Sequence, residues 1–143
     1  MITGLLHLHS SMRYVVLALM IITLVKAILN RKGGDFSSQA KLGLFTMISM
    51  HIQLLIGLAL FLNGHWADYT VDGMTRFIMM EHTPMMLIAI ILGTLGHSLA
   101  KRAADVATKF KRHIIFFGIS LLLVFAMIPW PFMRNFDLVY GWI

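Results

Sequence analysis

Histidine is the residue type whose number and placement in this sequence point to chemistry. The chain has seven histidines among its 143 residues and no cysteine, so thiolate ligands, thiol catalysis and disulfides are excluded. A bound metal or cofactor would have to use imidazole, thioether or carboxylate groups. Ionisable side chains in membrane-spanning segments are costly and usually face a bundle interior or a partner. Each histidine in an apolar segment is therefore a candidate site residue.

Four of these histidines are predicted to lie at two matched depths. With about 1.5 Å of rise per residue, His9 and His82 share a level on the outer side of the membrane midplane. By the same count, His97 and His113 share a level on the inner side. His82 and His97 are separated along one segment by about 22 Å of rise and about 60° of rotation, so one helix face can serve both levels.

Two such pairs predict haem b. Haem iron accepts two axial imidazoles, and a four-helix core can present them from facing helices. We expect His9 and His82 to be the metal ligands of one haem b, and His97 and His113 to be those of a second. The sequence leaves open whether one haem or two are bound.

Arg13 strengthens the outer site because it follows His9 by about one helical turn and lies on the same face. A guanidinium at this depth needs an anion. Either a haem propionate or Glu81, the neighbour of His82, would supply the negative charge. The alternative is an ion pair between Arg13 and Glu81 with no cofactor.

His51 is the most ambiguous histidine. It lies near the middle of the second apolar segment and has no histidine partner at its own depth. With Gln53 nearby, it is expected to be a hydrogen-bonded core residue, a member of a proton relay or a contact for a quinone. It would ligate haem only if its helix were shifted by several residues from the predicted position.

Three histidines are expected toward the membrane surface. His7 competes with His9 for the outer site, and His65 is expected on the surface of a loop. His113 directly follows two basic residues, so it belongs either to a haem site or to a basic collar at the cytoplasmic face.

Four apolar segments must position these side chains. The chain is 59% hydrophobic with a mean hydropathy of +0.82, well above the values of soluble domains. A helix needs about 20 apolar residues to cross a bilayer, and the predicted spans are residues 5–29, 40–62, 77–100 and 110–129. Short loops make consecutive helices antiparallel neighbours. Residues 1–143 are therefore predicted to form one all-α domain, an integral membrane four-helix bundle with up-down topology.

The distribution of charge predicts the orientation. The net charge is +6, and nine of the twelve Lys and Arg residues fall within residues 26–41 and 101–112. Such clusters flank membrane spans on the cytoplasmic side and do not indicate nucleic-acid binding. With both basic loops in the cytoplasm, both termini are expected to be extracytoplasmic. Pro129 is expected to end the fourth helix.

Several short motifs resemble a known group of proteins. They are His-Leu-His-Ser-Ser-Met-Arg-Tyr at residues 7–14, Gln-Leu-Leu-Ile-Gly-Leu at 53–58, Glu-His-Thr-Pro at 81–84, Gly-His at 96–97 and Ile-Pro-Trp-Pro at 128–131. They resemble small bacterial four-helix membrane proteins of the cytochrome b or b561-like type, and are similar to one half of haem A synthase. The resemblance implies haem binding in a bacterial inner membrane, with His9, Arg13, His82 and His97 as functional residues. His51 and His113 match less closely.

The sequence thus predicts a haem-b-binding membrane electron carrier, or a cytochrome subunit of a larger respiratory complex. Its expected partners are the lipid bilayer and other membrane subunits or further copies of the chain, with a quinone as a further candidate. The alternative is a cofactor-free structural or assembly subunit. An independent enzyme is not indicated, because phosphate-loop, zinc-protease and nucleophile-elbow motifs are missing. The twelve methionines allow copper binding, but methionine is also common core filler.

Overall fold

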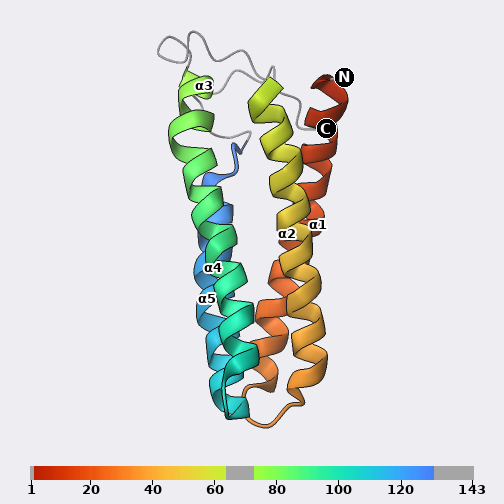
Figure 1. Ribbon diagram of the computed structural model, residues 1–143, viewed down its shortest axis with the longest axis vertical. Helices are drawn as coiled ribbons and strands as arrows, with labels where there is room; N and C mark the ends of the chain where they lie inside the picture. Colours follow the sequence, from red (N-terminus) through yellow and green to blue (C-terminus); the bar gives the residue numbers. More distant parts are fainter. Residues whose placement is uncertain (1, 64–72, 131–143) are drawn as a thin grey trace.

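The computed structural model describes residues 2–63 and 73–130, and it is built from helices packed along one axis (Figure 1). Their order is α1 (Ile2–Asn30), α2 (Phe36–Asn63), α3 (Gly73–Phe77), the π-helix η1 (Ile78–His82), α4 (Thr83–Arg102) and α5 (Val106–Met127). The segments α3, η1 and α4 follow one another without a break. No described residue is in a strand.

The chain is a multi-pass membrane protein with four candidate spans. The helices long and apolar enough to cross a bilayer are Ile2–Asn30, Phe36–Asn63, Thr75–Arg102 and Val106–Met127. The first three contain the predicted spans and extend them at both ends. The fourth begins earlier than predicted and ends at Met127 instead of Pro129. Large apolar side chains face outward, as expected for contact with lipid.

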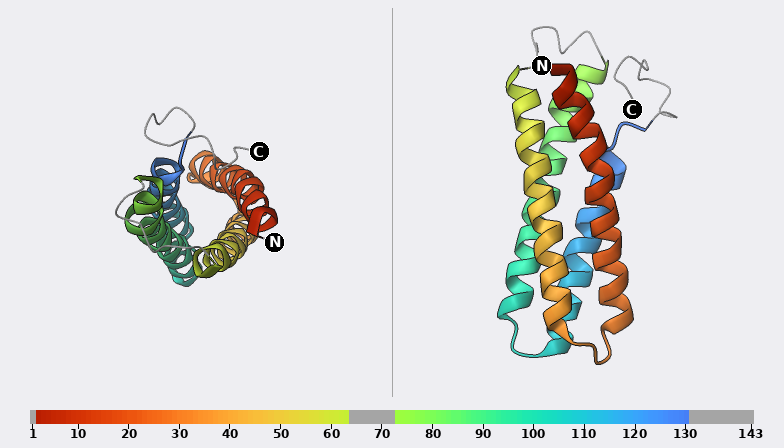
Figure 2. Two further views of the ribbon diagram at one scale, coloured as in Figure 1. Left: turned by 90° about the horizontal axis from the view of Figure 1, so that it is seen from above. Right: turned by 90° about the vertical axis from the view of Figure 1, so that its right-hand side faces the viewer.

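The spans form an up-down four-helix bundle, as predicted. Helix α1 packs against α2 and α5, and α4 packs against α5 and α2, so the helices form a ring when viewed along the bundle axis (Figure 2). The α1–α2 and α4–α5 connections lie at the same end (Figure 1). We call this the basic end, because it carries the basic loops, and we call the opposite one the far end.

Local chemistry explains where the helices begin and end at the basic end. The carboxylate of Asp35 accepts a hydrogen bond from the backbone N–H of Ser37 at 3.0 Å, at the start of α2. Asp105 does the same for Thr108 at 2.8 Å, at the start of α5. Such caps satisfy backbone donors that have no partner within the helix.

The end of α5 follows from proline. Ile128, which precedes Pro129, has an extended conformation with φ −72° and ψ 129°, because proline disfavours the helical conformation in the residue before it. The indole N–H of Trp130 then donates to the carbonyl of Phe125 at 2.8 Å. The sequence also predicts aromatic residues at the headgroup level near the outer ends of the second and fourth helices. Of these, Trp66, Tyr69, Tyr140 and Trp142 lie outside the described residues.

Two apolar clusters fill the bundle. The larger includes Met20, Met50 and Phe117, and the smaller, at the basic end, includes Ala27 and Phe110. Helices α4 and α5 approach each other closely at Gly96. An added Cβ there would lie 2.3 Å from the Cβ of Phe116, so only glycine fits this contact.

Replacing Gly96 with alanine should therefore destabilise the bundle. Overpacking a tight contact costs about 1–3 kcal/mol, and the opposing Cβ cannot rotate away, so the loss should exceed the gain in helix propensity of about 1 kcal/mol. The matched control is Gly118→Ala, whose new Cβ would lie 3.8 Å from Leu24. Unfolding in detergent micelles titrated with a denaturing detergent should show a lower midpoint for Gly96→Ala alone. Equal midpoints would contradict the close packing.

The cap of α5 should depend on pH. The hydrogen bond from Thr108 lowers the pKa of Asp105 below its usual value of 3.8. The contribution of the ionised Asp105 carboxylate to the stability of the cap is therefore complete above pH 3.8 and is lost as the pH falls through the lowered pKa. Hydrogen-exchange protection of the Thr108 amide, corrected for intrinsic rates, should decrease below about pH 4. In Asp105→Asn, which caps without titrating, protection should not change over this range. If the unmodified protein and Asp105→Asn showed the same pH profile, the ionised carboxylate would not be the group that stabilises the cap.

Candidate functional site

Two groups of polar side chains interrupt the apolar interior, one toward each end of the bundle. The structure brings together the histidines that were predicted to share a depth. His9 and His82 form the far-end pair, and His97 and His113 form the basic-end pair. The imidazole centroids are 6.3 Å apart in the far-end pair and 5.7 Å apart in the basic-end pair.

An irregular turn of helix positions His82. Pro84 has no N–H, and its ring would clash with the carbonyl four residues earlier. The chain widens into η1 just before it, where the N–H of Thr83 donates to the carbonyl of Ile78, five residues back. Such π-turns often occur at functional sites. The sequence analysis did not predict this turn, although Pro84 directly after Glu81-His82-Thr83 was its signal.

The hydrogen bond of His82 determines its tautomer. Its Nδ1 lies 2.8 Å from the carbonyl oxygen of Met127. A carbonyl can only accept, so Nδ1 carries the proton and Nε2 has a free lone pair. The ring of His82 meets that of His9 at an interplanar angle of 68°. His82 is thus held by α5 in the form that can bind a metal.

Helix α2 supports His9 from the other side. The amide of Gln53 donates to the carbonyl of His9 at 2.9 Å, and a Cβ at Gly57 would lie 2.9 Å from the Cε1 atom of His9. The glycine therefore makes room for the imidazole. The Nδ1 atom of His9 is buried and has no hydrogen-bond partner among the described residues. It is a polar atom with capacity for a ligand.

The charged residues near the far-end pair, Arg13 and Glu81, contact other side chains and do not pair with each other. Arg13 donates to the phenol oxygen of Tyr14 at 3.1 Å and lies 4.8 Å from the centroid of that ring. Glu81 is exposed and lies 3.9 Å from Arg76, so its ion-pair partner is Arg76 and not Arg13, the partner in the cofactor-free alternative. His7 is exposed, whereas His9 faces the bundle.

The basic-end pair is the more deeply buried. His97 is 4% exposed and His113 is fully buried, so the interpretation of His113 as part of a solvated basic collar is wrong. The two rings are tilted by 36°. A Cβ at Gly43 would lie 2.6 Å from the Cε1 atom of His113 and 3.0 Å from the Nδ1 atom of His97. Both imidazoles therefore pack against the bare backbone of α2.

A hydrogen-bonded network that the sequence analysis missed extends from His113. The amide nitrogen of Gln39 lies 3.2 Å from the Nδ1 atom of His113 and 3.0 Å from the carbonyl oxygen of Thr23. The hydroxyls of Thr23 and Thr46 are 2.7 Å apart. Gln39 lay just outside the predicted span at residues 40–62. The signal was a polar residue one turn before Gly43.

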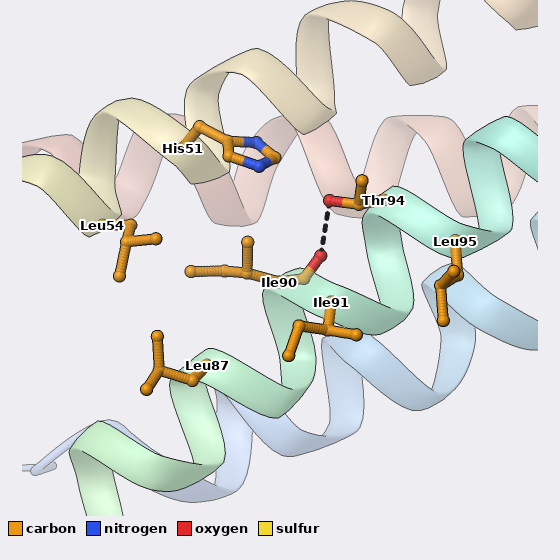
Figure 3. A pocket seen from close by; sticks show the side chains of 7 residues that line it. All are labelled: His51, Leu54, Leu87, Ile90, Ile91, Thr94 and Leu95. Atoms are coloured by element: carbon orange, nitrogen blue, oxygen red, sulfur yellow. Dashed lines mark hydrogen bonds between the residues drawn. The ribbon is translucent and has the colours of Figure 1, made fainter.

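His51 belongs to neither pair. Its Nδ1 atom donates to the carbonyl of Met47 at 2.8 Å, within α2. The ring lines a groove of about 270 Å³ between α2 and α4, opposite Thr94 (Figure 3). The rest of the lining is aliphatic: Leu54, Leu87, Ile90, Ile91 and Leu95. The prediction that His51 has no histidine partner agrees with this position, and its three proposed roles stay predictions.

The described residues hold no group of three or more His, Asp or Glu side chains that could bind a metal ion. Axial ligation of haem needs only two imidazoles, so the histidine pairs are a different kind of site. His65 lies outside the described residues. Comparisons with protein-family models, curated proteins and solved structures give no match.

Proposed function

We propose that this protein binds haem b between His9 and His82 and acts as a membrane electron carrier, or as a cytochrome subunit of a larger respiratory complex. The observation that carries the proposal is the far-end pair itself. Two half-buried imidazoles from different helices face each other across the bundle, and one of them is fixed in the tautomer that binds metals.

The spacing of the far-end pair suits two ligands of one metal. Imidazole nitrogens bind first-row metals at about 2.0–2.1 Å, so the centroids of two rings on opposite sides of one ion lie about 6.4 Å apart. The centroids of His9 and His82 are 6.3 Å apart. This separation is compatible with both imidazoles binding one iron.

The surroundings support the same function. The carbonyl of Met127 accepts the Nδ1 proton of His82, and such hydrogen bonds orient a ligating imidazole and raise its basicity. Gly57 leaves space against His9. Arg13, one turn deeper than His9, supplies a cation that suits a haem propionate. When bound, haem b carries one electron by cycling between ferric and ferrous iron.

The expected setting follows from charge and size. The basic loops between α1 and α2 and between α4 and α5 favour the cytoplasmic side. The far-end pair is therefore proposed to lie toward the extracytoplasmic face of a bacterial inner membrane. Four helices with short connections offer little surface for an independent reaction. Membrane subunits, or further copies of this chain, are therefore the proposed partners for electron exchange.

Replacing His82 with alanine should abolish haem binding at the far-end pair, because it removes one axial ligand. Absorption spectra of the purified, dithionite-reduced protein should lose the sharp α and β bands of bis-histidine haem. His7→Ala is the matched control, since His7 is an exposed histidine in the same turn of α1 as His9. Unchanged bands in His82→Ala would show that the ligand is wrongly assigned.

Replacing Gly57 with alanine should weaken haem binding by about 10–100-fold, the range seen when support of a metal ligand is lost. The added Cβ would displace the His9 ring, which ligation holds in place. Gly93→Ala is the control, because its Cβ would meet the flexible thioether of Met50 at 3.1 Å. Haem titration of the apoprotein measures both. Equal affinities would argue against ligation by His9 in this position.

A further inference from the structure

We infer that the basic-end pair binds a bridging water molecule and does not ligate a second haem. Three residues carry this inference: Gln39, His97 and His113 are at least nine-tenths buried, and each contains a polar atom without a hydrogen-bond partner among the described residues. These atoms are Oε1 of Gln39, Nδ1 of His97 and Nε2 of His113.

The amide of Gln39 has a defined orientation. Its nitrogen lies 3.0 Å from the carbonyl oxygen of Thr23, and a carbonyl can only accept, so the NH₂ group must be on this side. The second N–H of the same group points to the Nδ1 atom of His113 at 3.2 Å. This nitrogen must therefore be the acceptor.

The tautomer of His113 follows from that hydrogen bond. A neutral imidazole has one N–H and one lone pair. If Nδ1 accepts from Gln39, the proton is on Nε2. An N–H cannot ligate iron, and moving the proton to Nδ1 would set it against the NH₂ group of Gln39. His82 has the opposite arrangement, in which a carbonyl holds the proton on Nδ1 and leaves Nε2 free.

The two unsatisfied nitrogens of the pair both lie close to Gly43 on α2, and therefore close to each other. A Cβ at Gly43 would lie 3.0 Å from Nδ1 of His97 and 3.2 Å from Nε2 of His113. The first nitrogen can accept a hydrogen bond, and the second is a donor. A water molecule that accepts from His113 and donates to His97 satisfies both, as buried waters commonly do.

The surroundings disfavour haem and metal ions. His97 and His113 are on the neighbouring helices α4 and α5, which touch at Gly96, one residue before His97. These helices are thus too close together for a large planar ligand to lie between them. Lys101 and Arg112 lie near the pair, whereas the carboxylates of this end, Asp35 and Asp105, cap helices. A metal ion at this depth would therefore meet more positive than negative charge. A neutral ligand avoids this cost.

This inference deepens the proposed function and rests on it in one respect. If the far-end pair binds the only haem of each chain, electrons enter and leave at one level of the membrane. The chain then does not relay electrons between two haems across the bilayer.

Nuclear magnetic resonance of ¹⁵N-histidine-labelled protein in micelles, reduced with dithionite, tests the inference directly. Two-bond ¹H–¹⁵N correlations should show His113 protonated at Nε2 and unprotonated at Nδ1. The Nε2 proton should show a cross-peak to a long-lived bound water. Gln39→Met should shift the His113 resonances, because it removes the donor to Nδ1. Gln53→Met, the matched change on α2 at the far end, should leave them unchanged.

Three results would overturn the inference: an Nδ1–H tautomer for His113, iron-shifted resonances for either histidine of the pair, or a metal ion that is lost in His97→Ala. Haem content separates this inference from the proposed function. A colourless protein refutes the proposed function but still reports the tautomer of His113. Two haems per chain, with one lost in His113→Ala, refute the inference and leave the far-end site intact.

Discussion

Polar side chains inside a membrane protein must find partners within the protein, because lipid offers none. The interior of this bundle is organised by that requirement. The carbonyl of Met127 takes the proton of His82, and Gln39 bridges Thr23 and His113. Hydrogen bonds between helices therefore complement dispersion contacts between apolar side chains in holding the bundle together. The same bonds select one tautomer for His82 and the opposite one for His113, which determines what these two histidines can bind.

Helix α2 adapts the bundle to its histidines by lacking side chains where they approach. Gly57 faces His9 and Gly43 faces His97 and His113. The two glycines are about 21 Å apart along the helix and about 40° apart around it, by ideal geometry. One face of α2 thus meets both pairs. The pairs share this support but differ in their hydrogen bonds, and that difference distinguishes the proposed haem site from the proposed water site.

The sequence was sufficient to predict the four spans and which histidines lie together, but not the chemistry of each pair. Length and hydropathy predicted four helices, and rise per residue correctly matched His9 with His82 and His97 with His113. The π-turn before Pro84 and the network of Gln39, Thr23 and Thr46 were missed. Both depend on which groups other helices present at that point, and helical periodicity does not contain this information. The tautomers depend on single acceptors and donors, such as the Met127 carbonyl and the Gln39 amide, and could be assigned only from the packed structure.

The central claim is that the far-end pair ligates haem b. The most direct measurement is the absorption spectrum of the protein purified from haem-replete cells, oxidised and then reduced, together with the ratio of haem to chain. The account predicts a Soret band, sharp α and β bands on reduction, and one haem per chain. A colourless protein would contradict it and would favour a cofactor-free structural subunit.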